Sequence, residues 1–294
     1  MKPDTPPRSL LFIPAGEERK LAKALGSGAD LIILDLEDSV APDAKPAARD
    51  LAKGFLADHA GLARRPLLYV RVNALDSGLT ADDISVILQQ KPDGIMLPKA
   101  NSGADTARLA AMLDAGEQAA GLHQGGIGII VIATETPAAV LNIATFAGST
   151  PRLRGMTWGA EDLGTAIGAT ASRDEAGDFT APFMLARNLC LFGANAAGVQ
   201  AIDGVLADFR DAAGLEREAK AAARDGFTGK LAIHPAQVAA INAAFTPSAE
   251  EVAQAQAVVD AFAAQGNAGV IAIGGCMLDK PHLERARRVL ARVR

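Results

Sequence analysis

Acidic side chains follow several short apolar runs of the chain, at points where a strand would end. They are Glu37 and Asp38 after the run 31–36, Glu135 after 127–133, and Asp162 after 155–158. Carboxylates crowded at one place repel each other unless a cation lies among them. Oxygen donors suit Mg²⁺, with Mn²⁺ as an alternative, so we expect Glu135 and Asp162 to bind such an ion. The competing interpretation is that each acid caps a following helix or pairs with a surface lysine.

Two basic residues end neighbouring runs. The planar guanidinium of Arg71 matches a carboxylate or a thioester oxygen, so we expect it to bind substrate and to act in catalysis, besides pairing with Glu37 or Asp38. Lys99 follows the run 94–98 and raises the alternative of a Schiff-base aldolase. A lysine among carboxylates keeps a high pKa, whereas a nucleophilic amine needs a low one. We therefore predict that Lys99 gives electrostatic support and contacts the substrate.

The four histidines form no obvious catalytic group. His234 directly follows an apolar run, and we expect it to be a hydrogen-bonded scaffold residue rather than a base. The sequence lacks G-x-S-x-G, H-E-x-x-H and P-loop patterns. Nucleophilic serine, zinc-protease and nucleotide-phosphate chemistry are therefore poor explanations of this chain.

The elements that position these residues alternate between short apolar runs and longer amphipathic segments. The runs are 10–14, 31–36, 67–72, 94–98, 127–133, 155–158, 198–202 and 230–233, and the clearest helical segments are 44–59, 81–90, 106–122 and 206–224. This alternation predicts a (β/α)8 barrel, an α/β fold whose strand ends meet at one rim. A doubly wound sheet is less favoured, because no G-x-G-x-x-G pattern opens a first helix.

The chain continues after the eighth run, so we predict a barrel domain over 1–245 and an extension over 246–294. A helix is expected over 247–265 with Ser248 as its N-cap. A short apolar segment over 269–273, a turn over 274–281 and a last helix over 283–294 should follow. The extension is expected to pack on its own barrel or on a neighbouring subunit.

Composition limits the function classes. The 294 residues are 49% hydrophobic, which is ample for a core, but only 4% are aromatic. A formal charge of −5 makes nucleic acid a poor partner. No apolar run approaches the ~20 residues of a membrane helix, and no secretory signal pattern opens the chain. We expect a cytoplasmic protein in which Cys190 and Cys276 are reduced.

Several segments in order resemble the citrate lyase beta-subunit family, within the superfamily of HpcH/HpaI aldolases and of malyl-CoA and citramalyl-CoA lyases. They are RSLLFIPAGEERKLAKAL, ADLIILDLEDSV, YVRVNALDSG, GIMLPKA, ETPAAV, WGAEDLGTAIGA, GFTGKLAIHPAQV and GCMLDKPH. The resemblance implies a (β/α)8 barrel with a C-terminal extension, in homotrimers or hexamers. It also implies a Mg²⁺-dependent enzyme that cleaves or forms a carbon–carbon bond in a 3-hydroxyacyl thioester of coenzyme A or of an acyl-carrier partner.

The resemblance also assigns roles to residues. Glu135 and Asp162 are similar to the family's metal ligands, and Arg71 to its substrate-binding arginine. Glu37 and Asp38 are similar to an acidic pair that organises the metal's waters or the substrate. Asp279 resembles an aspartate that related lyases lend to a neighbour's site, although an aspartate in a turn explains it equally well.

Coenzyme A carries phosphates, so the site needs positive charge beside it. Arg19 and Lys20 lie in a predicted helix directly after the first run, and its N-terminus should face the rim. We expect them to contact these phosphates; a solvated helix face is the alternative.

Three other functions remain open. A malyl-CoA thioesterase would use the same site. A class II oxo-acid aldolase is disfavoured, because its early-strand histidine is missing near DLEDSV. A non-catalytic subunit of a citrate-lyase-like complex is disfavoured by the intact set of Arg71, Glu135 and Asp162.

Overall fold

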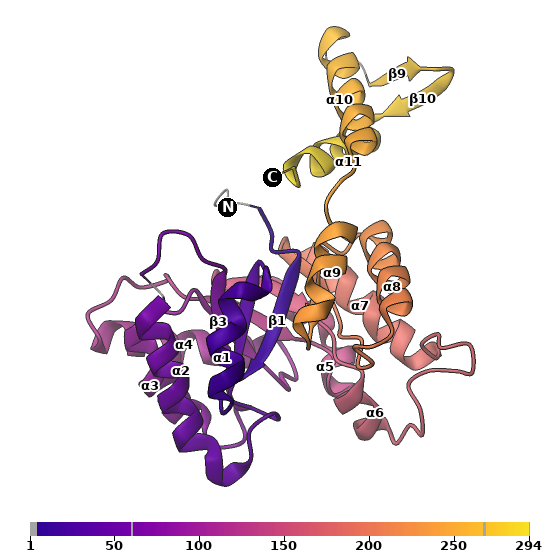
Figure 1. The fold of residues 1–294 in the computed structure, drawn as a ribbon. Helices are drawn as coiled ribbons and strands as arrows, with labels where there is room; N and C mark the ends of the chain where they lie inside the picture. Colours follow the sequence, from indigo (N-terminus) through magenta and orange to yellow (C-terminus); the bar gives the residue numbers. More distant parts are fainter. Residues whose placement is uncertain (1–4, 60, 267–268, 294) are drawn as a thin grey trace.

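The computed structural model describes residues 5–59, 61–266 and 269–293. Within these ranges, eight parallel strands close into a barrel in chain order, which confirms the predicted fold (Figure 1). The strands are β1 Ser9–Pro14, β2 Leu31–Asp35, β3 Leu67–Arg71, β4 Gly94–Leu97, β5 Gly128–Ile132, β6 Leu153–Thr157, β7 Gln200–Asp203 and β8 Gly229–Ala232. Every strand overlaps the apolar run that predicted it, because strands buried on both faces need continuous apolar sequence.

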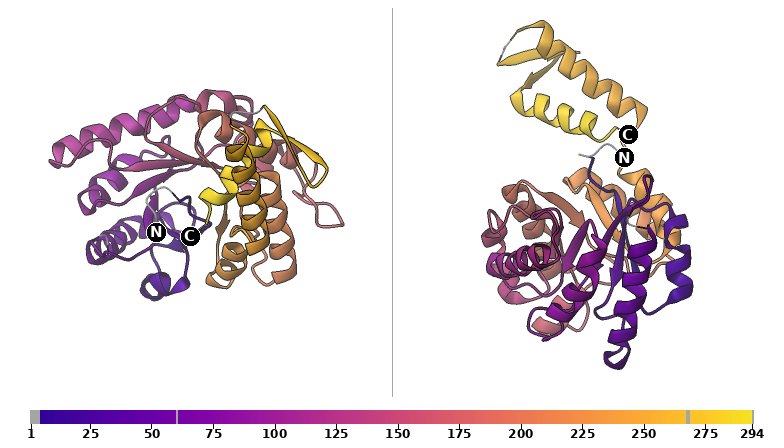
Figure 2. Two further views of the ribbon diagram at one scale, coloured as in Figure 1. Left: turned by 90° about the horizontal axis from the view of Figure 1, so that it is seen from above. Right: turned by 90° about the vertical axis from the view of Figure 1, so that its left-hand side faces the viewer.

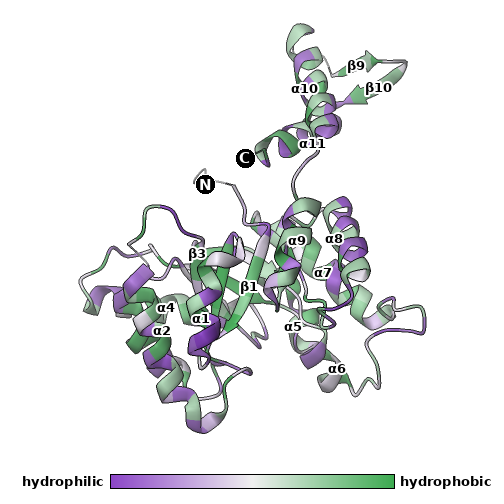
Figure 3. Ribbon diagram, viewed as in Figure 1, coloured by the Kyte–Doolittle hydropathy of each residue, from purple (hydrophilic) through white to green (hydrophobic). Residues whose placement is uncertain are grey.

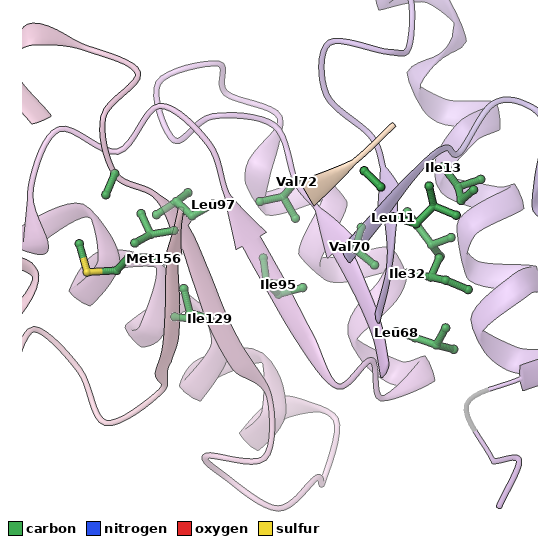
Figure 4. Close-up of a cluster of buried hydrophobic side chains, with 14 of the residues drawn as sticks. Leu11, Ile13, Ile32, Leu68, Val70, Val72, Ile95, Leu97, Ile129 and Met156 are labelled. Atoms are coloured by element: carbon green, nitrogen blue, oxygen red, sulfur yellow. The ribbon is translucent and has the colours of Figure 1, made fainter. Parts of the chain in front are cut away.

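Alternate residues of each strand point to opposite faces of the sheet. On β2, Leu31 and Ile33 lie in the barrel interior, whereas Ile32 and Leu34 join the larger core between strands and helices. Figure 4 shows side chains of this outer core on neighbouring strands. The same alternation directs Asp35, two residues beyond Ile33, into the mouth of the barrel. A polar residue in this position can therefore face a ligand.

The helices that surround the barrel are amphipathic. They are α1 Glu18–Ala24, α2 Lys45–His59, α3 Thr80–Ile87, α4 Gly103–Ala119, α5 Pro137–Leu141, α6 Glu161–Ile167, α7 Ala181–Ala197, α8 Ala212–Asp225 and α9 Val238–Ala244. Figure 3 shows β1 as mainly hydrophobic and α2 as mixed along its length. The predicted start of a helix at position 206 is wrong. Instead α8 begins at Ala212, because the Asp211 side chain caps it by accepting a hydrogen bond from the Gly214 amide at 2.8 Å.

The extension contains α10 Ala249–Ala264, β9 Val270–Ile273, β10 Cys276–Asp279 and α11 Lys280–Ala291. Ser248 caps α10, as predicted, and Glu251 completes a capping box with it. The predicted turn over 274–281 is too long: Gly274 and Gly275 alone make the turn, both with positive φ, and an antiparallel strand follows them. The last helix begins at Lys280, earlier than predicted, and the final residue lies outside the described ranges.

The extension leaves the barrel at the end where the strands begin (Figures 1 and 2). Arg8, next to the start of β1, donates to Thr246 Oγ1 at 2.7 Å, and Arg292 Nη2 donates to the Phe245 carbonyl oxygen at 2.9 Å. A cavity of about 440 Å³ lies between the extension and α8 and α9. The extension therefore stands away from the rim that carries the strand ends.

Among the residues with described positions, none belongs to a helix that combines the length and the apolar character needed to cross a membrane.

Candidate functional site

The rim at the carboxyl ends of β2 to β6 gathers most of the predicted site. Its charged members are Glu37, Asp38, Arg71, Lys99, Glu135 and Asp162, connected through ion pairs, a backbone hydrogen bond and charge interactions. Each belongs to the end of a strand or to the first residues after it. The barrel closure therefore brings together side chains that are up to 125 positions apart in sequence, from 37 to 162.

Arg71 is held by a partner to which the sequence had assigned no role. Its Nε and Nη2 atoms each donate to a carboxylate oxygen of Asp35 at 2.7 Å, in a bidentate pair inside the barrel mouth. The two residues are direct partners in the β2–β3 register. Burial alone raises the pKa of Asp35, but the Arg71 guanidinium holds it below its usual value. This pair fixes Arg71 while its Nη1 group stays directed toward Glu37.

Glu37 is almost fully buried between the two cations. Its Oε2 lies 2.9 Å from Arg71 Nη1, and its Oε1 pairs with the Lys99 ammonium. Among the described residues Oε2 has no hydrogen-bond partner of good geometry. Burial outweighs both cations and raises the pKa of Glu37. An oxygen in this state is available to a water molecule, a substrate hydroxyl or an ion.

Lys99 contacts acids on two sides of the rim. Its ammonium donates to Asp38 Oδ2 at 2.9 Å and lies 3.5 Å from Asp162 Oδ1. Burial lowers the pKa of this amine, but the hydrogen bonds to Glu37 and Asp38 more than compensate and raise it above its ordinary value. The protonated amine is a poor nucleophile, which argues against the Schiff-base alternative.

Glu135 is the most strongly perturbed acid of the site. Its side chain is buried, and its Oε2 accepts a hydrogen bond from the Lys99 amide at 2.5 Å. Burial, together with the charges of Asp162 and Glu37, raises the pKa of Glu135 to about 8. Gly159 makes room for it, because a Cβ there would lie 3.0 Å from Glu135 Cγ.

These carboxylates fit a divalent ion only in part. Crowding and burial of like charges favour a bound cation, and the donor atoms are the hard oxygens that Mg²⁺ prefers. Within the described ranges, however, no group of three or more histidine, cysteine, aspartate or glutamate side chains could hold a metal ion unaided. An ion held by Glu135 and Asp162 would therefore need water or substrate oxygens, which is the usual condition of Mg²⁺ in enzymes.

Buried residues that sequence reasoning did not single out support the β2 and β3 ends. Lys45 Nζ donates to the carbonyl oxygens of Leu36 and Glu37 at 2.8 and 2.9 Å, and to Asn73 Oδ1 at 2.7 Å. Asp83 in turn accepts from the Asn73 amide and side chain at 2.7 Å. Lys45 and Asp83 lie at helix positions that read as ordinary solvent-facing charge, so the sequence carried no signal for them.

A second buried network supports the β6 end. Asp203 accepts hydrogen bonds from Trp158 Nε1 at 2.9 Å, Arg187 Nε at 3.0 Å and Lys230 Nζ at 2.8 Å. Trp158 also packs edge-on against Phe179, with ring centroids 4.9 Å apart. Because Asp162 lies four residues beyond Trp158, in the first turn of α6, this network helps to position that turn.

Four other predicted residues lie outside this cluster. Arg19 and Lys20 are exposed in the first turn of α1, at the same end of the barrel. His234 caps the 3-10 helix Pro235–Gln237 by accepting from the Ala236 amide, which confirms the scaffold role. Asp279 lies in the extension at the opposite end, where His282 Nδ1 is 2.5 Å from its Oδ1 and lowers its pKa.

Comparison with family models gives two overlapping matches. Residues 8–235 match the HpcH/HpaI aldolase/citrate lyase family, and residues 182–294 match a family described as C-C bond lyase of the TIM-barrel fold. The first match alone covers most of the chain and all the acids of the rim.

Several relatives match this chain over nearly its full length. A (3S)-malyl-CoA thioesterase from Cereibacter sphaeroides is 36% identical over 98% of this chain and 94% of its own length. The human mitochondrial citramalyl-CoA lyase is 33% identical over 97% of this chain and 85% of its own length. The citrate lyase subunit beta of Escherichia coli is 33% identical over 97% of this chain and 92% of its own length.

A solved structure of the protein CitE from Mycobacterium tuberculosis, in complex with magnesium, acetoacetate and coenzyme A, is similar across 98% of both chains. Its TM-score is 0.78 at 33% sequence identity. A citrate lyase from Burkholderia xenovorans has a TM-score of 0.85 at 24% identity, which supports the fold alone.

Removing any divalent ion should make the stability of this protein depend on the ionisation of Glu135. Its pKa is about 8 in the folded chain against an ordinary 4.5, so its contribution to stability is full below about pH 4.5 and is lost as pH rises through 8. We expect the free energy of unfolding in chelator to fall by about 3 kcal/mol more in the wild type than in Glu135→Gln between pH 5.5 and 8.5. Urea denaturation at each pH measures the free energy of unfolding of the two proteins. Parallel pH profiles for the wild type and Glu135→Gln would contradict the raised pKa of Glu135.

Proposed function

The chain belongs to the HpcH/HpaI aldolase/citrate lyase family, and on that premise we propose that it is a Mg²⁺-dependent carbon–carbon lyase. Its substrate would be a 3-hydroxyacyl-CoA thioester such as citryl-, malyl- or citramalyl-CoA, cleaved to acetyl-CoA and an oxo acid. The observation that carries the proposal is the acidic rim, in which the buried Glu135 interacts with the charges of Asp162 and of the Arg71 guanidinium that Asp35 fixes.

Glu135 and Asp162 would hold the ion, with Mn²⁺ as an alternative to Mg²⁺. When bound, the ion would supply Lewis-acid polarisation of substrate oxygens. The family supports this choice, because the structure of CitE contains magnesium together with acetoacetate and coenzyme A. Glu37 and Asp38 would orient the water or substrate hydroxyl beside it.

The reaction needs one base and one site for a developing negative charge. A base takes the proton of the 3-hydroxyl group, and the oxygen electrons form the carbonyl of the oxo acid. The C2–C3 bond breaks, and its electron pair enters the enolate of acetyl-CoA, which is then protonated at C2. Arg71 retains Nη hydrogens beyond those bound to Asp35, and these would stabilise the enolate oxygen; Lys99 would contact the substrate carboxylate.

Asp279 is our candidate for the base, acting in the site of a second copy. Within one chain, β10, which ends at Asp279, lies beyond the end of the barrel where the strands begin, whereas Glu135 follows the carboxyl end of β5 (Figure 1). Asp279 therefore does not reach the rim of its own chain. An extension that projects beyond its barrel can reach the next subunit of a homotrimer or hexamer. The half-exposed carboxylate of Asp279 would then contact the 3-hydroxyl group of the substrate.

Coenzyme A would approach from the side of α1. The exposed side chains of Arg19 and Lys20 would offer positive charge to its phosphates at the same end of the barrel as Glu135. An acyl-carrier thioester would present the same reacting atoms and is the alternative carrier.

Thioester hydrolysis is the second candidate function. The (3S)-malyl-CoA thioesterase of Cereibacter sphaeroides matches 98% of this chain at 36% identity, so the relatives include both chemistries. The two reactions differ in products: a lyase releases acetyl-CoA, whereas a thioesterase releases free CoA and leaves the carbon chain intact.

Product analysis tests the proposal. We expect acetyl-CoA from at least one of malyl-, citramalyl- and citryl-CoA in the presence of Mg²⁺, and none after chelation. Glu135→Gln should lower this rate by about a hundredfold or more, because it removes a charged ligand without changing the side-chain shape. Free CoA without acetyl-CoA would favour the thioesterase. A rate of acetyl-CoA release that is unchanged both by chelator and by Glu135→Gln would reject the metal-dependent mechanism.

Mixed oligomers test the position of Asp279. Subunits with Asp279→Ala and subunits with Glu135→Ala should each be inactive, but together they should recover up to about a quarter of the wild-type rate if the site is shared between neighbours. Glu135→Ala mixed with Asp162→Asn is the matched control and should recover nothing, because both changes affect the same rim. No recovery in verified mixed oligomers would remove Asp279 from the neighbour's site.

A further inference from the structure

The ammonium group of Lys99 lies among the carboxylates of the acidic rim. It pairs with Glu37 and Asp38 from the β2 end and with Asp162 from the β6 end. β2 and β6 are on opposite sides of the closed barrel, and β4, which precedes Lys99, lies midway between them. One side chain thus connects acids across the mouth.

The backbone of Lys99 also contacts the acidic rim. Its φ of 52° is in the left-handed region, which a lysine rarely adopts. In this conformation its amide donates to Glu135 Oε2 at 2.5 Å. The residue therefore contacts both proposed metal ligands, Glu135 through the backbone and Asp162 through the side chain.

The contact with Asp162 is the one most easily exchanged. At 3.5 Å it is an ion pair without a hydrogen bond, whereas Asp38 accepts a hydrogen bond from the same nitrogen at 2.9 Å. Lys99 is the only ion-pair partner of Asp162 within the part of the chain that the structure describes. A divalent ion that binds Asp162 therefore competes with Lys99 for this carboxylate.

We propose that Lys99 is a resident counter-cation, which a divalent ion displaces from Asp162 when it binds. This inference rests on the proposed metal site. The Lys99 ammonium stabilises the crowded carboxylates of the metal-free protein and repels the incoming ion. It thereby lowers the affinity of the site for divalent ions while keeping the empty rim folded.

The alternative is that Lys99 only positions the acids for the metal. The two roles predict opposite signs for a neutral side chain at this position. A counter-cation opposes the ion, so its removal tightens metal binding; a positioning residue prepares the ligands, so its removal weakens metal binding. The hydrogen bond that the backbone N–H at position 99 donates to Glu135 is available to any substitution except proline.

The experiment is calorimetric titration of the chelator-treated, full-length protein with Mg²⁺. We expect Lys99→Met and Lys99→Gln to bind Mg²⁺ at least about tenfold more tightly than the wild type, because a unit charge a few Å from a divalent ion repels it appreciably even at high dielectric. Lys99→Arg keeps the charge and should stay near the wild-type affinity. The melting temperature without metal should fall in both neutral variants and rise more on adding Mg²⁺ than in the wild type.

Unchanged or weaker Mg²⁺ binding in both neutral variants would overturn the counter-cation role of Lys99. The lyase function would still stand if the wild type binds Mg²⁺ and releases acetyl-CoA. If one neutral variant does not fold without metal, the other and the Mg²⁺-induced rise in melting temperature decide. A wild type that binds no Mg²⁺ would overturn the counter-cation and the metal-dependent function together.

Discussion

Carboxylates at the mouth of this barrel repel one another, and the positive charge between them offsets this repulsion. Arg71 supplies one such charge from β3, held by its bidentate pair with Asp35, and Lys99 supplies another from the β4 end. These cations do not offset the burial of Glu135 and the charges of its neighbouring carboxylates, which raise its pKa to about 8. The remaining imbalance is what makes the rim suited to a divalent ion, and the proposed chemistry depends on it.

The rest of the molecule serves this arrangement by making the strand ends rigid. Inside the barrel, alternation of side chains directs Asp35 and Arg71 toward the mouth above an apolar interior. Behind the strand ends, Lys45 fixes the carbonyl groups around Glu37, and Asp203 fixes Trp158 before Asp162. Both supporting groups are buried, so their charges are not screened by solvent and hold the backbone in one position.

Much of the fold and of the rim could be predicted from the sequence. The spacing of apolar residues indicates strands and helices, and a polar residue at a strand end is expected at the rim. Apolar runs marked all eight strands of the barrel, and reading only their carboxyl ends found the acids, Arg71 and Lys99; β10 of the extension was predicted as part of a turn. The pairing of Asp35 with Arg71 was missed, because it depends on the register of two strands and not on spacing along one. Lys45 was missed since burial of a helical lysine is decided by its neighbours in space. The place of Asp279 depends on how the extension leaves the barrel, about which local sequence says nothing.

The proposed function depends on a divalent ion bound between Glu135 and Asp162. A crystal of the protein soaked with Mn²⁺ and a small oxo acid would test it, because anomalous scattering locates the ion without assumptions about its ligands. We predict a single strong peak within coordination distance, roughly 2.0–2.3 Å, of carboxylate oxygens from both residues. A well-ordered soaked site without that peak, or a peak bound by other residues, would show that Glu135 and Asp162 are not the metal ligands.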